Sequence, residues 1–227
     1  MSDILTGGTM KPSNTLPDSS RIAALAILCV AILMMASPAA VHAETDVTVP
    51  AFKSVDLRNG GHVILRHGSK QRVRVVQGNT KESAIRVEED GRLVIDRCPD
   101  GCPRGYTLEV EIVTPEIGAL SVTDGGWLRS SGTFPKQASL AVAVESGGTL
   151  DMRSMNVGAV AAAVLQGGRI FTEPRETLTA AISQGGAVLY WGNPDVRRSI
   201  QHGGVVSRGK AADRDRPFEK IGGAVEH

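Results

Sequence analysis

The stretch ISQGGAVLYWG (Ile182–Gly192) places two glycines between a β-branched run and a second apolar run. Similar stretches lie at equal distances to either side, VLQGGRIFTEP at Val164–Pro174 and IQHGGVVSRG at Ile200–Gly209. Short runs with alternating apolar residues predict β-strands. A glycine pair between two such runs predicts a sharp bend. The stretch therefore predicts a strand, a bend and a second strand, repeated along the chain.

The repeat covers the second half of the chain. Its fixed points are the second glycines of five pairs, which recur at nearly even intervals: Gly126, Gly148, Gly168, Gly186 and Gly204. In every copy an apolar β-branched residue precedes this glycine by four positions, and an apolar residue follows it by two. We expect a short single-stranded parallel β-helix, because rungs of about 18–22 residues at about 3.3 Å per residue are each long enough for one coil of a solenoid. An antiparallel meander with the glycine pairs as hairpin turns is the alternative.

Residues 44–117 carry a different β pattern, with short alternating runs such as HVILRHG and QRVRVVQG separated by turn residues. This pattern predicts hairpins. We therefore expect one all-β domain over residues 44–209. It consists of a hairpin region at 44–117 that runs into glycine-rich structural rungs at 118–209. The charged residues 210–227 would form a cap over the open end of the stack, or a tail.

The first 43 residues have the features of a secretory signal. Arg21 precedes the apolar run IAALAILCVAILMMA, and the small-residue sequence Val41-His42-Ala43 follows it. Such an order predicts a signal peptide over residues 1–43 that is cleaved before Glu44. A retained membrane anchor is the alternative, although a spanning helix needs about 20 apolar residues. Either Met1 or Met10 can be the start of translation.

The segment that follows the signal holds two cysteines, Cys98 and Cys102, in the sequence CPDGC. Exported proteins meet an oxidising compartment, so the spacing predicts a disulfide that closes a tight turn. Free thiols or a metal-binding pair are the alternatives. Redox motifs use two intervening residues rather than three, and zinc would need further ligands nearby.

Several segments in order resemble a known family. They are AFKSVDLRNGGHVILRHGSKQRVRVVQG, EEDGRLVID and YTLEVEIVTPEIGALSV, followed by the glycine rungs. This order is similar to the head-GIN domain family of putative autotransporter adhesins. Its opening residues would be Phe52, Val55, Gly61, Val63 and Leu65. The family's rungs usually carry Gly-Ser-Gly, where this chain has a polar residue and Gly-Gly. The resemblance implies an envelope-facing β-helical domain and carries over no catalytic residues.

The sequence shows no pattern typical of a catalytic residue, a cofactor site or a metal site. The carboxylates on the rungs fall at different offsets from the glycines, and the histidines lack the spacing of metal ligands. Aromatic rings and guanidinium groups can form a binding surface. The candidates for such a surface are Trp127, Trp191, Arg129 and Arg169.

The formal net charge of +1 gives no basic field for nucleic acid. We expect an exported module, periplasmic or at the cell surface, without a membrane span in its mature form. It would bind or support structure in the bacterial envelope, with a polysaccharide or another envelope protein as partner. One alternative is a polysaccharide-active enzyme on the same scaffold, with Asp151 and Asp124 as the first carboxylates to test. The other is a structural protein that self-assembles. The ligand and the oligomeric state stay open.

Overall fold

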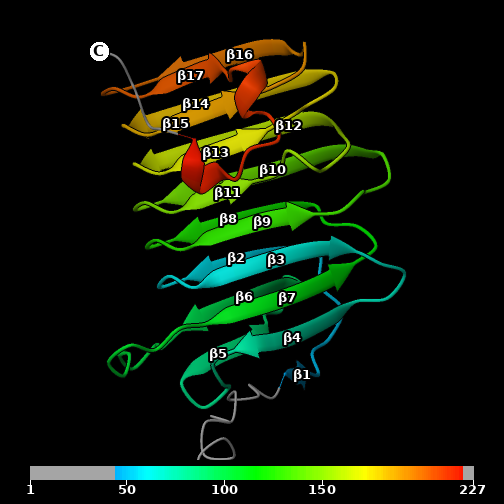
Figure 1. Cartoon of the computed structure of the whole chain (residues 1–227), viewed down its shortest axis with the longest axis vertical. Coiled ribbons are helices and arrows are strands. Elements are labelled where there is room, and N and C mark those ends of the chain that lie inside the picture. The colour runs from blue at the N-terminus through cyan, green and yellow to red at the C-terminus, as the bar shows by residue number, and fades with distance from the viewer. Residues whose placement is uncertain (1–43, 222–227) are drawn as a thin grey trace, which may run out of the picture. The chain divides into compact units, whose positions relative to one another are not determined.

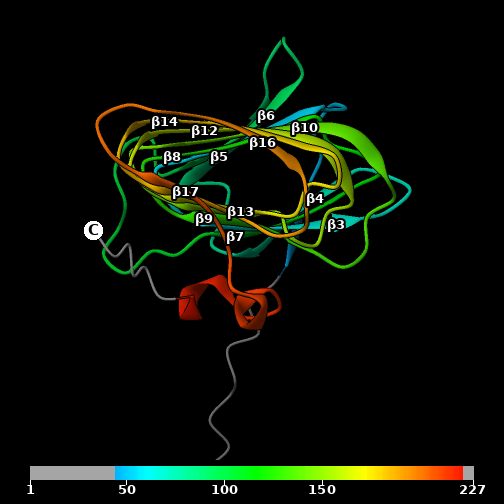
Figure 2. The same cartoon turned by 90° about the horizontal axis from the view of Figure 1, so that it is seen from above.

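A computed structural model describes residues 44–221, which contain seventeen β-strands and two 3-10 helices. The prediction of an all-β fold is confirmed. The predicted signal peptide at 1–43 lies outside the described residues, as do residues 222–227 at the end of the predicted cap or tail. The strands form two large sheets that face each other across a shared core (Figures 1 and 2).

The larger sheet, called sheet A here, has nine strands in the order β1-β4-β7-β3-β9-β11-β13-β15-β17. Its antiparallel part is β1, β4 and β7, and its other neighbours are parallel. The strands of sheet A are β1 (Thr45–Val47), β3 (His62–His67), β4 (Arg72–Gln77), β7 (Glu109–Thr114), β9 (Trp127–Ser131), β11 (Thr149–Asp151), β13 (Arg169–Thr172), β15 (Ala187–Tyr190) and β17 (Val205–Arg208).

The second sheet, sheet B, has eight strands in the order β16-β14-β12-β10-β8-β2-β6-β5. Only the pair β5–β6 is antiparallel. Its strands are β2 (Ser54–Arg58), β5 (Ser83–Val87), β6 (Arg92–Arg97), β8 (Ala119–Thr123), β10 (Gln137–Glu145), β12 (Val157–Gln166), β14 (Thr177–Gln184) and β16 (Asp195–Ile200). The two 3-10 helices, η1 (Ala211–Asp213) and η2 (Phe218–Lys220), follow the last strand.

From β8 onward the chain alternates between the sheets. Each strand of sheet B is followed by a strand of sheet A, and equivalent strands of successive repeats pair in parallel. The apolar positions noted in the sequence lie in register, since Val144 pairs with Val164 and Leu150 pairs with Ile170. The side chains of these residues are buried between the sheets. Each repeat therefore adds one layer to a common core.

The prediction of hairpins for residues 44–117 is correct only for β5–β6. β2 lies parallel to both β6 and β8, and β3 lies parallel to both β7 and β9. The pair β2/β3 is thus a further copy of the repeat, placed between the later pairs β6/β7 and β8/β9. Its bend, Asn59-Gly60-Gly61, has the same apolar offsets as the five glycine pairs, at Leu57 and Val63. The copy is hard to find by spacing because a long insertion separates Gly61 from Gly126.

The second glycine of each pair lies where neighbouring bends approach most closely. Gly168 has a φ of +96°, and a Cβ atom there would lie 2.4 Å from Val144 Cγ1. Its carbonyl oxygen accepts a hydrogen bond of 3.0 Å from the backbone N–H of Ala187 in the next repeat. Glycine allows both the left-handed conformation and the close approach.

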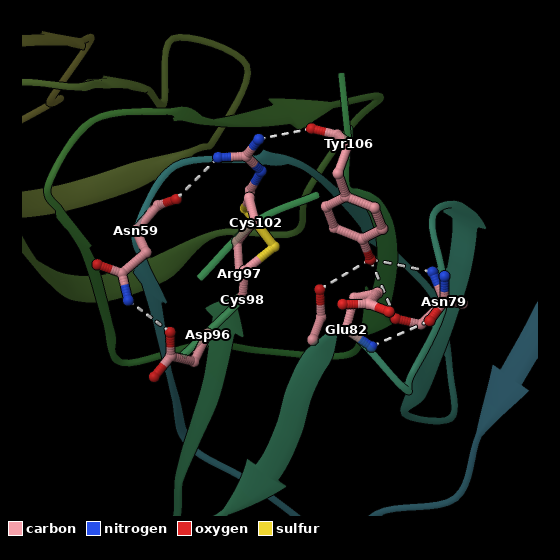
Figure 3. The surroundings of a disulfide bond; sticks show 9 residues. Asn59, Asn79, Glu82, Asp96, Arg97, Cys98, Cys102 and Tyr106 are labelled. Atoms are coloured by element: carbon pink, nitrogen blue, oxygen red, sulfur yellow. Dashed lines mark hydrogen bonds between the residues drawn. A yellow bond between two sulfur atoms is a disulfide. The ribbon is translucent and has the colours of Figure 1, made fainter. Parts of the chain in front are cut away.

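The cysteine loop replaces the glycine bend between β6 and β7. A disulfide joins Cys98 and Cys102, whose Cα atoms are 5.0 Å apart (Figure 3). Beside it, the Arg97 guanidinium donates hydrogen bonds to the carbonyl oxygens of Tyr106 (2.5 Å) and Asn59 (3.4 Å). These contacts connect the cysteine loop to the bend of the adjacent repeat.

Removal of the disulfide should have a modest effect on stability. For so short a loop, the chain-entropy model gives a loss of about 2 kcal/mol in the free energy of unfolding. Urea unfolding of the oxidised protein, the reduced protein and the Cys98→Ser/Cys102→Ser variant would measure this loss. We expect the reduced protein and the variant to have the same free energy of unfolding. An unchanged midpoint in both would show that the cross-link does not restrict the unfolded chain.

Among the described strands, β16 and β17 form the final repeat of the stack. Arg198 on β16 pairs with Ala180, which is buried in the core, so it occupies a position that faces inward in the preceding repeat. Its guanidinium crosses to sheet A and donates a hydrogen bond of 3.4 Å to the carbonyl oxygen of Val206. An inward-pointing charge on an end strand disfavours pairing with another chain. Arg198 therefore protects this end of the stack.

We expect Arg198→Val to promote end-to-end association, because the final repeat would then present an apolar edge. Sedimentation velocity would detect a weight-average mass larger than that of the unmodified protein. Arg197→Val is the matched control, since Arg197 lies on the same strand but pairs with the exposed Thr179 and so occupies an outward-facing position. Equal behaviour of the two variants would contradict a protective role for Arg198.

Candidate functional site

The candidate site is the outer face of sheet A, where alternate residues of β9, β11, β13 and β15 point away from the core. Many of the residues at these positions and just beyond the strand ends are aromatic or charged: Trp127, Arg129, Asp151, Arg153, Arg169, Phe171, Glu173 and Trp191. Four of them, Asp151, Phe171, Glu173 and Trp191, are 5% exposed or less, although they point outward. Something outside the sheet must therefore cover them.

The cover is the C-terminal segment of residues 210–221, which we call the strap. It leaves β17 and folds back across the outer face of sheet A, where η1 and η2 lie outside the two sheets (Figures 1 and 2). Phe218 and Ile221 are buried and form an apolar cluster with Phe171 and Trp191. The strap was predicted as a cap over the open end of the stack or as a tail. Its contacts are instead with the face of sheet A.

Arg153 is the central contact between the sheet and the strap. Its Nε and Nη2 atoms donate to the two carboxylate oxygens of Asp151, at 2.8 and 2.6 Å. The remaining donor positions serve the strap. Nη1 donates to two backbone carbonyl oxygens and Nη2 to a third, at 2.8, 2.8 and 2.9 Å, on Asp213, Arg214 and Arg216. The guanidinium therefore fixes the path of the strap backbone as well as the buried carboxylate.

The planar Arg153 group also lies over aromatic rings. Its central carbon is 5.5 Å from the ring centroid of Phe171 and 5.2 Å from that of Trp191. Cation–π contacts of this kind strengthen as water is excluded. The indole N–H of Trp191 donates to the backbone carbonyl of Lys210 at 3.0 Å, so the ring also holds the beginning of the strap.

A second ion pair, between Glu173 of the face and Arg214 of the strap, also attaches the strap to sheet A. The Glu173 carboxylate accepts hydrogen bonds from Nε and Nη2 of Arg214, at 2.8 and 2.9 Å. This contact raises the pKa of Arg214 above its usual value. Arg175 approaches the same carboxylate at 3.3 Å. The Glu173 carboxylate thus accepts its shortest hydrogen bonds from the strap.

Beyond the strap the face is more open. Trp127 is half-buried and stacks on His62 of β3, with ring centroids 4.5 Å apart. The guanidinium of Arg129 lies 5.2 Å from the Trp127 ring, and Phe218 of the strap meets that ring edge-on at 5.7 Å. Burial lowers the pKa of His62. The lower pKa favours the neutral imidazole next to the tryptophan.

The structure places all four predicted surface residues on one face. Trp127 and Arg129 form its open margin. Arg169 lies 5.7 Å from the Phe171 ring and donates to the carbonyl of Ile221 at 3.5 Å. Trp191 is 4% exposed and is covered by the strap, so it belongs to the interior of the site and cannot contact a ligand while the strap is in place.

Sequence reasoning missed the residues that connect these four, chiefly Phe171, Phe218 and Arg153. A signal for the first was available, because Phe171 is an apolar residue at an outward-facing position. An apolar side chain at such a position indicates that another segment packs over the outer face of the sheet. Asp124, one of the two carboxylates considered for catalysis, lies at a bend away from the strap. It is exposed and has a φ of +59°.

A pocket of about 280 Å³ opens beside the strap. The residues that line it are all polar or charged: Ser130, Asp151, Arg153, Ser154, Glu173, Arg214 and Asp215. Within residues 44–221 no group of three or more His, Cys, Asp or Glu side chains is arranged to hold a metal ion. Over the same residues, no helix is long and apolar enough to cross a membrane. The charged residues around the pocket and the rings near Trp127 make the site a network of ion pairs next to an aromatic surface.

A family model and several solved structures match this chain. A family model described as "Putative auto-transporter adhesin, head GIN domain" matches residues 51–173, more than half of the chain. A structure from Bacteroides fragilis described as a putative adhesin is 15% identical and has a TM-score of 0.39; the match covers 73% of this chain and 95% of that one. For a putative cell adhesion protein from Clostridium sporogenes, the identity is 12% and the TM-score 0.35, with 74% and 99% covered.

A putative adhesin from Parabacteroides merdae is 13% identical, with a TM-score of 0.33 and 74% and 96% of the two chains covered. Comparison with curated protein sequences gave no match. The resemblance drawn from the sequence, from Phe52 through the glycine rungs to Gly209, agrees with the family match, which covers residues 51–173. The protein belongs to the head GIN domain family of putative auto-transporter adhesins.

Proposed function

We propose that the chain from Glu44 onward is an exported, non-enzymatic binding module of the bacterial envelope. In this proposal residues 118–209 form successive coils of a short β-solenoid, as the parallel pairing of successive repeats supports. A disulfide between Cys98 and Cys102 is consistent with an oxidising compartment. The rigid coils would hold a binding face in a fixed shape, outside the cytoplasm.

The pairing of the carboxylates carries the non-enzymatic part of this proposal. Enzymes that cleave polysaccharides commonly need two carboxyl groups that can reach the scissile bond, one of them able to donate a proton. Asp151 and Glu173 are the buried carboxylates of this face, and each accepts two hydrogen bonds from one arginine. Both therefore serve the attachment of the strap. This arrangement favours binding over turnover.

The open margin of the face gives the chemistry of the ligand. An aromatic ring can stack on a sugar, and a guanidinium group can pair with a carboxylate or phosphate. Trp127 and Arg129 provide both groups side by side. Within residues 44–221, the Arg129 guanidinium lies over the Trp127 ring and forms no ion pair with a carboxylate. The ligand class that fits is an acidic polysaccharide of the envelope.

Retention on immobilised polysaccharides would test this function. The oxidised protein from Glu44 to His227 would be applied to acidic and neutral glycans, and new chain ends would be assayed in the same wells. We expect retention on acidic glycans without new ends. Arg129→Ala should weaken binding by about tenfold, equal to about 1.4 kcal/mol. Arg197→Ala is the matched control, since it removes an exposed arginine from the other sheet.

Three results would contradict the proposal. New chain ends would indicate an enzyme and direct attention to Asp124 and Asp151. Retention that Arg197→Ala weakens as much as Arg129→Ala would indicate nonspecific charge attraction. The absence of retention on any glycan would favour a protein partner or self-assembly instead.

A further inference from the structure

The strap is held to sheet A in the manner of a bound peptide. It contains only the 3-10 helices η1 and η2, and no strand of sheet A or B includes its residues. Its attachment consists of side-chain contacts from the face to its backbone, one bidentate ion pair and two inserted apolar side chains. It is joined to the folded repeats only through Gly209. Detachment of the strap would therefore leave every sheet hydrogen bond in place.

The face recognises separate features of this segment. The Glu173 carboxylate accepts hydrogen bonds from the guanidinium of Arg214. The backbone carbonyl oxygens of residues 213, 214 and 216 accept hydrogen bonds from Arg153. Further along the strap, the Phe218 ring fits between Trp127 and Phe171, with centroid distances of 5.7 and 6.3 Å. The recognised side chains are Arg214 and, four residues further on, Phe218.

The charges beneath the strap also indicate recognition. Burial of ionised groups contributes little net stability, even when they are paired. An apolar cover would protect Phe171 and Trp191 at lower cost. The face instead buries Asp151, Arg153 and Glu173, whose fixed hydrogen-bonding geometry selects one segment over others.

We propose that the outer face of sheet A is a peptide-binding site that a second copy of this chain can occupy with its own strap. The second copy is the occupant that the structure supports, because its strap carries the same Arg214, Phe218 and Ile221 that the face already binds. Exchange of an identical segment through a short hinge needs no new interface chemistry. The site goes beyond the proposed polysaccharide binding, which uses the margin at Trp127 and Arg129.

A charge-swap experiment with full-length chains tests this exchange. In a Glu173→Arg chain the face repels its own strap, and in an Arg214→Glu chain the strap is repelled by its own face. In the mixture, each strap is complementary to the face of the other chain. We expect light scattering to show at least about tenfold more dimer in the equimolar mixture than in either chain alone. The reason is that restoring one ion pair between residues 173 and 214 should change the association constant by about tenfold.

Arg197→Glu mixed with the unmodified protein is the matched control. It reverses an exposed charge on sheet B, and its mixture should stay at the mass of its components. Folding of each chain would be checked by circular dichroism. A charge-swap mixture of folded chains that shows no more dimer than its components would overturn the proposal.

A peptide measurement covers the case in which a charge-reversed chain does not fold. A labelled peptide with the sequence of residues 210–221 would be titrated into the full-length Phe218→Ala chain, whose own strap is weakened. We expect binding at least about tenfold tighter than to the unmodified chain, because the intact strap competes at an effective concentration of about 1 mM. Equal or absent binding to both chains would overturn the proposal, whatever the glycan retention shows.

Discussion

Gly126→Ala should lower the free energy of unfolding by about 2–5 kcal/mol, the sum of a left-handed backbone penalty and an overpacking cost. Gly126 has a φ of +82°, and a Cβ atom there would lie 2.5 Å from the carbonyl oxygen of Gly61. That oxygen accepts the backbone N–H of Trp127 at 3.0 Å. A shift at this point would disturb the junction between the β2/β3 pair and the later repeats.

The neighbouring glycine gives a matched control. Gly125 also has a positive φ, +85°, but a Cβ atom there would meet nothing within 4 Å. Gly125→Ala should therefore show only the backbone penalty of about 1–2 kcal/mol. Urea unfolding monitored by tryptophan fluorescence would compare the two variants. Equal losses would mean that backbone conformation alone, and not the close approach of the two bends, requires glycine at this position.

Arg153→Ala should lower the free energy of unfolding by about 3–5 kcal/mol, the usual cost of leaving one partner of a buried ion pair alone. The Asp151 carboxylate, 5% exposed, would lose both of its guanidinium hydrogen bonds. Three strap carbonyls would lose their donor as well. Chemical unfolding and hydrogen exchange of residues 210–221 would measure the loss of stability and the release of the strap.

Arg175→Ala is the control for Arg153→Ala. Arg175 also pairs with a buried carboxylate of this face, Glu173, but its side chain is 51% exposed. Its removal should cost less than about 1 kcal/mol, and the strap should stay protected. Arg153→Met combined with Asp151→Leu should be milder than Arg153→Ala, because it removes both buried charges. A loss below about 1 kcal/mol for Arg153→Ala would show that the strap does not depend on this contact.

The strands and bends of this protein were largely predictable from local sequence. Alternation of apolar residues fixes which side chains can face a core, and a glycine pair fixes where the backbone can bend. The predicted columns, such as Val144 with Val164 and Leu150 with Ile170, pair in the structure. A sixth copy of the bend, at Gly61, obeys the same offsets. It escaped prediction only because a long insertion separates it from Gly126.

The site was less predictable, because its residues are brought together by contacts distant in sequence. Trp127 and Trp191 belong to different positions of the repeat, and nothing in their spacing indicates a common cluster. Both lie on the outer face of sheet A, and Phe218 of the strap joins them into one cluster, since it lies against Trp127 and also against Phe171, which stacks on Trp191. The charged composition of the strap predicts a cap at the end of the stack, whereas its two buried apolar residues, Phe218 and Ile221, pack on the face of sheet A.

The sequence by itself determined the all-β class, the length of the repeat and the positions of the glycine bends, since these depend on side-chain period and backbone conformation within a few residues. Only the tertiary structure decided the order of the repeats, with β2/β3 inserted between β6/β7 and β8/β9. It also decided that the strap lies on sheet A, where Arg153 meets its carbonyl groups. Many strand orders and strap positions satisfy the same local pattern, and the buried contacts between distant segments select one of them.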